Sequence, residues 1–208
     1  MALEITVHGF ADGERIPDPN CFGNPGEPME MGANRSPSVT WSGAPDATRS
    51  FALLVVDPDV PSVGDDVNVE GRVIPASLPR VDFYHWVLVD IPAGTTELAE
   101  GASSDGVTPR GKAPGARPFG VEGINGYTGF MAGDPDMAGT YGGYDGPCPP
   151  WNDELLHHYH FRLFALDVDS LGLSGEFSGE DAVAAMEGHV LAEASQMGTY
   201  TLFAGLLG

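Results

Sequence analysis

The run SFALLVVD, residues 50–57, restricts the possible folds of this chain more than any other segment. Six apolar residues follow one another from Phe51 to Val56, over the length of a strand. The run lacks the alternation of apolar and polar residues that marks a strand with one face in water. A continuous apolar strand is typical of a strand buried on both faces. The fold must therefore cover this strand from two sides.

Five other segments are predicted to be strands and one a helix. The strands are expected in LEITVHGF (3–10), SVTWSG (38–43), DFYHWVLVDIP (82–92), HHYHFRLFALDV (157–168) and TYTLFAGL (199–206). The helix is expected over 179–198, with acidic residues in its first turn and Gly198 at its end. Its apolar residues at helical spacing are Val183, Met186, Val190, Leu191 and Ala194.

Strands outnumber helices and do not alternate with them, which disfavours a doubly wound α/β fold. The prediction is a mostly β fold, an antiparallel β-sandwich with long loops and a C-terminal helix, built as one domain over residues 1–208. The chain has 29 Gly and 18 Pro without a repeat period, which indicates many turns and excludes a collagen-like chain. Long irregular connections are expected over 11–37 and 93–150.

The charge balance is strongly acidic. The chain has 30 Asp and Glu against 9 Lys and Arg, a net charge of −21, and Lys112 is its single lysine. The acids are scattered, which indicates a solvated surface rather than a disordered tail. Such a surface repels itself in dilute buffer, and at about 1 M salt a Debye length of about 3 Å screens the repulsion. We therefore expect adaptation to a salty cytoplasm, and neither nucleic-acid binding nor stable association with anionic membranes.

The N-terminal residues MALEITVHGF show neither the basic region nor the long apolar run of a signal peptide, and no stretch approaches the length of a transmembrane helix. A cytoplasmic location is therefore expected. Cys21 and Cys148 lack Cys-x-x-Cys spacing, and a cytoplasm keeps thiols reduced, so both are expected to be packing residues.

Polar side chains stand at one end of three predicted strands. Asp57 and Asp59 end the first apolar run, and their two-residue spacing predicts that both face the same side. Pro58 and Pro61 restrict the backbone there. On the other two strands, His85 precedes Trp86, His157 and Tyr159 share one face, and His158 and His160 share the other.

Each of these features also has a purely structural explanation. Asp-Pro-Asp-x-Pro can end a strand with an Asx turn, a single histidine in an apolar strand is usually a core residue, and the segment 157–160 can be an exposed strand end. All of them lie where a core strand meets a loop, however. Together they suggest one polar cleft of the kind that holds a small anion or a metal ion.

Several segments resemble, in order, the phosphatidylethanolamine-binding proteins, and especially their bacterial and archaeal branch often called Raf-kinase-inhibitor-like. The segments are GANRSPSVTWSGAPDATRSFALLVVDPDVP, FYHWVLVDIPAG, GGYDGPCPP, HHYHFRLFALDV and EGHVLAEASQMGTY. The resemblance covers residues 3–203. One such motif is a weak signal, but five in the same order are a specific one.

The resemblance implies an antiparallel β-sandwich with a small pocket for phosphate-like anions, and a binding or regulatory protein rather than an enzyme. The implied ligand-binding residues are Asp57, Asp59, His85, Pro147, Pro149, His157 and Tyr159. No cofactor and no metal are implied. The carboxylates would orient the histidines and raise their pKa, so that a protonated His85 or His157 faces the anion. Homodimer formation is compatible with the sequence, and no protein partner is indicated.

Two segments depart from the family pattern. WNDELL, residues 151–156, replaces an expected short, glycine-containing connection, and 127–142 resembles an insertion. Both adjoin the implied pocket loop and bear on ligand size and access.

Two other functions compete with ligand binding. Asp57, Asp59, His85 and His157 could serve a metal-dependent hydrolase, although the close spacing of typical metal motifs is missing. Cys148 could act as a nucleophile with His157 as base, although nothing in the sequence lowers the pKa of this thiol.

Overall fold

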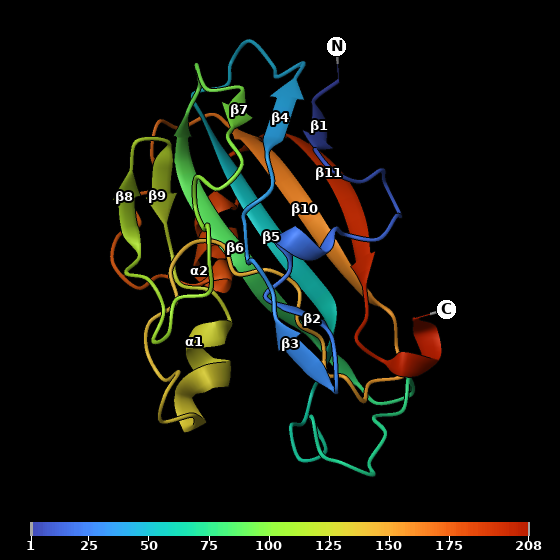
Figure 1. Cartoon of the computed structure of the whole chain (residues 1–208). Coiled ribbons are helices and arrows are strands. Elements are labelled where there is room, and N and C mark those ends of the chain that lie inside the picture. The colour runs from blue at the N-terminus through green and yellow to red at the C-terminus, as the bar shows by residue number, and fades with distance from the viewer. Residues whose placement is uncertain (1, 208) are drawn as a thin grey trace.

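A computed structural model describes residues 2–207, and its main element is a six-stranded antiparallel sheet (Figure 1). The strand order is β11-β10-β5-β6-β9-β8. The strands are β5 (Ser50–Pro61), β6 (Arg80–Pro92), β8 (Gly115–Arg117), β9 (Gly120–Glu122), β10 (His157–Leu166) and β11 (Val190–Tyr200). The apolar strand β5 lies between β10 and β6, inside the sheet, as its composition predicts.

Smaller sheets and short helices complete the structure. A three-stranded sheet has the order β1-β4-β7, and β2 and β3 form a separate hairpin within the connection predicted over 11–37. These strands are β1 (Glu4–Val7), β2 (Gly23–Pro25), β3 (Met29–Met31), β4 (Val39–Ser42) and β7 (Glu97–Leu98). The helices are α1 (Tyr127–Phe130), α2 (Gly179–Met186) and the 3₁₀ turns η1 (Asp18–Asn20), η2 (Met131–Gly133) and η3 (Ala204–Leu206).

Both faces of β5 are covered. Leu53 is fully buried in a core that the three-stranded sheet closes through Trp41. Leu54, on the opposite face, is fully buried in a second core to which Met186 of α2 contributes. The architecture is therefore a sandwich in which the large sheet has the small sheet on one face and α2 on the other (Figure 1), which confirms the predicted fold class.

The helix predicted over 179–198 is correct only for its first half. Ser178 starts α2 with a capping box, in which its side chain accepts from the backbone NH of Asp181. Gly188, at φ +80°, then turns the chain, and 190–200 pair with β10 as the edge strand β11. Backbone pairing with β10 along this whole segment outweighs the helical spacing of a few apolar residues. Val190, one of those residues, is exposed and does not enter the core.

The strand predicted over 199–206 is also only partly formed. β11 ends at Tyr200, and the chain continues through Thr201 into the 3₁₀ turn Ala204–Leu206. Leu202 is buried in the main core, whereas Leu206 and Leu207 are exposed, so only the first part of this apolar stretch enters the core.

The antiparallel pairing brings three strand ends to one place. Asp57, near the end of β5, lies opposite Phe83, near the start of β6. Val56 lies opposite His160, near the start of β10. The polar residues of all three strand ends therefore gather at one end of the sandwich, together with α1 and the loop that joins β5 to β6 (Figure 1).

Candidate functional site

A cavity of about 120 Å³ opens among these strand ends. Five of the residues predicted for the pocket line it: Asp57, His85, Pro149, His157 and Tyr159. The rest of the wall is mainly apolar and comes from Val60, Pro61, Gly64, Val67, Asn68, Phe83, Tyr127, Phe130, Cys148 and Pro150.

Two predicted residues, Asp59 and Pro147, lie outside this lining. The pairing of β5 with β6 is irregular between Asp57 and Val60, so the simple alternation that placed Asp57 and Asp59 on one face does not hold. Asp59 Oδ2 instead accepts from the backbone NH and from Nδ1 of His158, at 2.9 and 2.8 Å. The carbonyl of Pro147 accepts from the amides of Phe22 and Gly23 and fixes the pocket loop from behind.

His157 is held between two carboxylates. Its Nδ1 lies 2.7 Å from Oδ2 of Asp57, and its Nε2 lies 3.2 Å from Oδ2 of Asp153. Burial alone would lower the pKa of His157, but the hydrogen bonds and charges of Asp153 and Asp57 outweigh burial and raise this pKa to about 9. His157 is therefore charged at neutral pH, and both of its N–H groups are already donated to carboxylates.

Arg80 completes the charge balance behind His157. Its guanidinium forms two hydrogen bonds to the carboxylate of Asp153, and one of them, from Nη2 to Oδ1, measures 3.0 Å. Burial alone would raise the pKa of Asp153, but hydrogen bonds from His157 and Arg80 hold it below its usual range. Asp57, His157, Asp153 and Arg80 thus form a buried chain with two negative and two positive charges, as buried ions require.

His85 has a different environment. Its Nδ1 lies 2.8 Å from the carbonyl oxygen of Asp145, so Nδ1 carries a proton and donates it. Nε2 forms no hydrogen bond within residues 2–207. The rings of Phe83, Tyr127 and Tyr159 surround the imidazole at 4.8–5.7 Å between ring centroids. Burial lowers the pKa of His85, more than nearby Asp57 raises it, so the ring is neutral at neutral pH with Nε2 available to a ligand.

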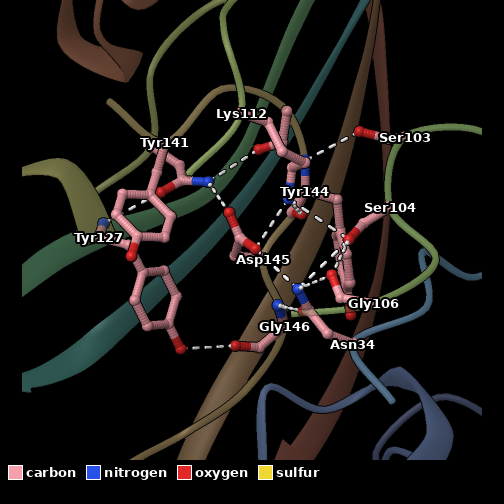
Figure 2. A network of polar contacts seen from close by, with 12 residues as sticks. Asn34, Ser103, Ser104, Gly106, Lys112, Tyr127, Tyr141, Tyr144, Asp145 and Gly146 are labelled. Carbon is pink, nitrogen blue, oxygen red and sulfur yellow. Dashed lines mark hydrogen bonds and ion pairs between the residues drawn. The ribbon is translucent and has the colours of Figure 1, made fainter. Parts of the chain in front are cut away.

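The loop that holds His85 is fixed by a buried polar network (Figure 2). The carboxylate of Asp145 accepts from Asn34 Nδ2 at 2.7 Å, from Lys112 Nζ at 2.8 Å and from Asn125 Nδ2 at 2.8 Å. The backbone NH of Asp145 donates to the carbonyl of His85 at 3.0 Å. The single lysine of the chain thus neutralises the buried carboxylate of the residue that sets the His85 tautomer.

Tyr159 and Tyr127 differ in how their hydroxyls are used. The Tyr127 hydroxyl donates to the carbonyl of Gly146 at 2.8 Å, which ties α1 to the pocket loop (Figure 2). The Tyr159 hydroxyl is buried and has no hydrogen-bond partner in the described part of the chain. A buried hydroxyl without a partner is costly, so a group that completes its hydrogen bond would bind favourably here.

The geometry does not favour the two catalytic alternatives. Both ring nitrogens of His157 are engaged by carboxylates, and across residues 2–207 no three His, Cys, Asp or Glu side chains are arranged to share a metal ion. Burial raises the pKa of Cys148 to about 12, so its thiol is not activated, and a protonated His157 cannot act as its base.

Several residues that build the site were not predicted from the sequence. Phe83, Tyr127 and Phe130 line the cavity, while Asp145 and Asp153 orient the two histidines. One signal could have indicated part of this set. A lysine retained in a chain that otherwise has none is expected to have a specific partner, and Lys112 pairs with Asp145.

In the described chain, no helix combines the length and the apolar character needed to span a membrane.

Comparisons with known proteins agree with this architecture. The family model "Phosphatidylethanolamine-binding protein" matches residues 6–201. A UPF0098 protein of Methanothermobacter thermautotrophicus is 35% identical over 199 residues, covering 95% of this chain and 98% of that protein. The UPF0098 protein YbcL of Escherichia coli is 31% identical over 180 residues, covering 86% and 76%.

Solved structures give the same result. The crystal structure of E. coli YbcL, described as a new member of the mammalian PEBP family, has a TM-score of 0.70 at 28% identity and covers 97% of this chain and 99% of that one. A Chlamydia trachomatis homologue, CT736, has a TM-score of 0.64 at 29% identity and covers 96% and 97%. This chain belongs to the phosphatidylethanolamine-binding protein family.

Proposed function

We propose that the pocket binds a small phosphorylated ligand, or an anion of similar shape, without converting it. Two polar groups at one small cavity carry the proposal: Nε2 of His85 and the hydroxyl of Tyr159, neither of which has a hydrogen-bond partner among residues 2–207. A phosphoryl group can accept from Tyr159 and from a protonated His85, and a singly protonated phosphate can donate to the neutral ring.

The carboxylate of Asp57 in the wall does not oppose an anion. Its Oδ2 is engaged by the charged His157, and its Oδ1 accepts from the backbone NH of Asp59 at 2.8 Å. Because Asp153 and Arg80 balance each other behind His157, the inner wall carries no excess negative charge.

The size of the cavity supports a small ligand or the head of a larger one. Its volume of about 120 Å³ is well below the roughly 300–1,000 Å³ of pockets that enclose drug-sized molecules. Most of its lining is apolar, so a few polar groups are left to recognise the ligand.

The chemistry of the lining supports binding rather than catalysis. The pKa of Tyr159 is raised well above its usual value by burial, and the pKa of Cys148 is raised as well. Neither group is an activated nucleophile. We therefore infer a regulatory protein that changes its interactions when the pocket is filled.

Titration calorimetry with inorganic phosphate tests the proposal at pH 5.5 and pH 8 in a fixed, high concentration of KCl. Phosphate should bind the wild type more tightly at pH 5.5, because protonated His85 is a donor and the neutral Nε2 is not. In His85→Asn, whose amide nitrogen lies at the position of Nδ1 and can still donate to the Asp145 carbonyl, no titrating nitrogen remains at the position of Nε2, so binding should be weaker and the protein's part of the pH dependence should vanish. Equal affinity in both proteins would show that the anion binds elsewhere.

The acidic composition leads us to propose a cytoplasm with high salt as the setting, without nucleic-acid or stable membrane partners. The melting temperature should then rise from dilute buffer to about 1 M KCl, where surface charges are screened. Vesicles of anionic lipid should not sediment the protein at low salt. A melting temperature that does not change with salt would overturn the proposed salt adaptation. Clear sedimentation with the vesicles would overturn the proposal that the protein has no stable membrane partner.

A further inference from the structure

The loop over residues 62–79, between β5 and β6, forms one wall of the cavity. Gly64, Val67 and Asn68 of this loop line it. In Figure 1 the loop extends beyond the sheet at the end opposite the N-terminus. It contains no helix or strand, so its position depends on contacts from outside the loop.

Asn152 supplies the central contact. This side chain is 2% exposed, and its Nδ2 donates to the carbonyls of Asp66 at 2.8 Å, Arg72 at 3.2 Å and Val69 at 3.4 Å. Its Oδ1 accepts from the backbone NH of Asn68 at 3.0 Å. One buried amide thus contacts four backbone groups along the loop, and the carbonyls of Asp66 and Val69 also accept from the amides of Val69 and Arg72 within the loop.

The neighbours of Asn152 reinforce the attachment. The backbone NH of Ile74 donates to the Asn152 carbonyl at 2.9 Å, and the amide of Trp151 donates to Oδ1 of Asn68 at 3.1 Å. Glu154 Oε1 accepts from the backbone NH of Ala76 at 2.7 Å. The 151–156 segment therefore acts on the pocket mainly through this loop, because none of its residues lines the cavity.

The wall on this side of the cavity is largely apolar, and the side-chain oxygen of its polar residue, Asn68, already accepts from Trp151. Val67 lies in it together with Val60 and Phe83, whereas the polar groups available to a ligand come from His85 and Tyr159. A ligand that places its phosphoryl group at His85 would have the wall built by the loop available for the rest of its structure.

We infer that Asn152 is a positioning residue that holds the 62–79 loop as an apolar subsite, so that the pocket prefers a phosphomonoester with a compact apolar substituent over inorganic phosphate. This inference rests on the proposed function. Burying a few apolar carbons against the wall would favour such a ligand, since each buried CH₂ contributes about 0.8 kcal/mol.

The test compares inorganic phosphate with phenyl phosphate by calorimetry on the wild type, Asn152→Asp and Asn152→Ala. Asn152→Asp keeps the size and the acceptor for Asn68, but it loses both N–H donors and turns a carboxylate toward three carbonyls. Asn152→Ala loses the same donors without adding charge. In both variants the preference for phenyl phosphate should fall about tenfold, while the affinity for inorganic phosphate stays within about twofold.

Glu154→Gln is the matched control, because it lies on the same segment and keeps an oxygen that can accept from Ala76. It should keep the wild-type preference. Hydrogen exchange of the Asn68 and Ile74 amides should accelerate in the Asn152 variants and not in the control. Asn68→Gly, which suits the φ of +57° at that position, removes the contact to Trp151 and should shift the preference in the same direction by a smaller factor.

Folded Asn152 variants with an unchanged preference for phenyl phosphate would overturn the inference. If the Asn152 variants do not fold, an unchanged preference in Asn68→Gly would overturn it. A wild type that binds neither phosphate nor phenyl phosphate would overturn the proposed function instead.

Discussion

The two histidines of the pocket, His85 and His157, are both buried, yet their surroundings differ. His157 has a carboxylate on each nitrogen and a pKa of about 9. His85 has a carbonyl on one nitrogen, aromatic rings around it and a lowered pKa. His157 is thus charged and donates from both ring nitrogens, while His85 is neutral and its Nε2 has no hydrogen-bond partner in the described part of the chain.

The sequence predicted the same role, ligand binding, for both histidines. The contrast between their surroundings assigns them different roles. A histidine whose donors are all engaged holds strands together, and in this pocket His157 links β10 to β5 through Asp57. A histidine with a free nitrogen and a pKa below the usual value can respond to a ligand and to pH. We therefore expect changes at His157 to act first on stability, and changes at His85 to act first on binding.

The largest effect is expected from His157→Ala. It leaves Asp57 as a buried carboxylate without its charged partner, and breaking a buried pair in this way costs about 3–5 kcal/mol of unfolding free energy. Urea denaturation in high KCl measures the loss. His85→Asn, which leaves no charge unpaired, should lose clearly less.

A double variant tests the cause of that loss. Adding Asp57→Asn to His157→Ala removes the unpaired charge, so the double variant should be more stable than the sum of the two single changes predicts. Strict additivity would mean that the loss comes from missing ring volume, and the contrast between the two histidines would then not be electrostatic.

The next effect concerns pH. The pKa of His157 is raised to about 9 in the folded protein and lies near 6.5 in the unfolded chain, so its contribution is fully present below pH 6.5 and is lost as the pH rises toward 9. The unfolding free energy of the wild type should therefore fall between pH 6.5 and 8.5, by an amount on the order of 2 kcal/mol. Cys21 and Cys148 have raised pKa values in the fold, so their ionisation in the unfolded chain also lowers the unfolding free energy at high pH. The measurement therefore stops at pH 8.5, which limits this contribution.

His157→Gln provides the control for this slope. The variant cannot titrate at position 157, so its unfolding free energy should be nearly flat over the same range. A wild-type slope that persists in this variant would assign the titration to another group.

The sequence could place the histidines on strands, but it could not show which carboxylate serves which ring. Apolar runs predicted β5, β6 and β10, and alternation predicted that His157 and Tyr159 share a face. The bond from His85 to Asp145 spans 60 residues, and that from His157 to Asp57 spans 100. Such pairings depend on strand register and on loop paths, which local patterns do not encode.

The irregular pairing of β5 with β6 after Asp57 is also a feature that the local sequence pattern does not predict. Two-residue spacing is a sound guide in a regular strand, but one break in the ladder turned Asp59 toward His158. The second half of the helix predicted over 179–198 is a strand for a related reason, because the edge of β10 was available for pairing and the sequence alone does not show it.

Lys112→Met is expected to have a smaller effect on stability than His157→Ala, and a measurable effect on His85. Lys112 Nζ donates to Asp145 Oδ1 and to the carbonyl of Tyr144, both at 2.8 Å. The amides of Asn34 and Asn125 would remain on Asp145, so the loss should be about 1–3 kcal/mol.

The tautomer of His85 gives the second measurement. If the network fixes the carbonyl of Asp145, nitrogen NMR shifts of the His85 ring should show a mixture of tautomers in Lys112→Met and the single Nδ1–H form in the wild type. Lys112→Arg, which keeps the charge, should retain most of the wild-type pattern. An unchanged tautomer in Lys112→Met would confine the lysine to a role in folding.

The smallest effect is expected from His158→Ala, next to His157 in the chain. His158 Nδ1 lies 2.8 Å from Oδ2 of Asp59, nearly the same distance as in the His157–Asp57 pair, but the two side chains are 38% and 20% exposed. Water and salt screen such a pair, so the loss should stay below about 1 kcal/mol and shrink further in 1 M KCl. Urea denaturation of His157→Ala and His158→Ala at low and high salt makes the comparison, with two neighbouring histidines and the same kind of partner. A loss in His158→Ala as large as in His157→Ala would mean that burial does not set the difference, and the assignment of His157 as the structural histidine would lose its basis.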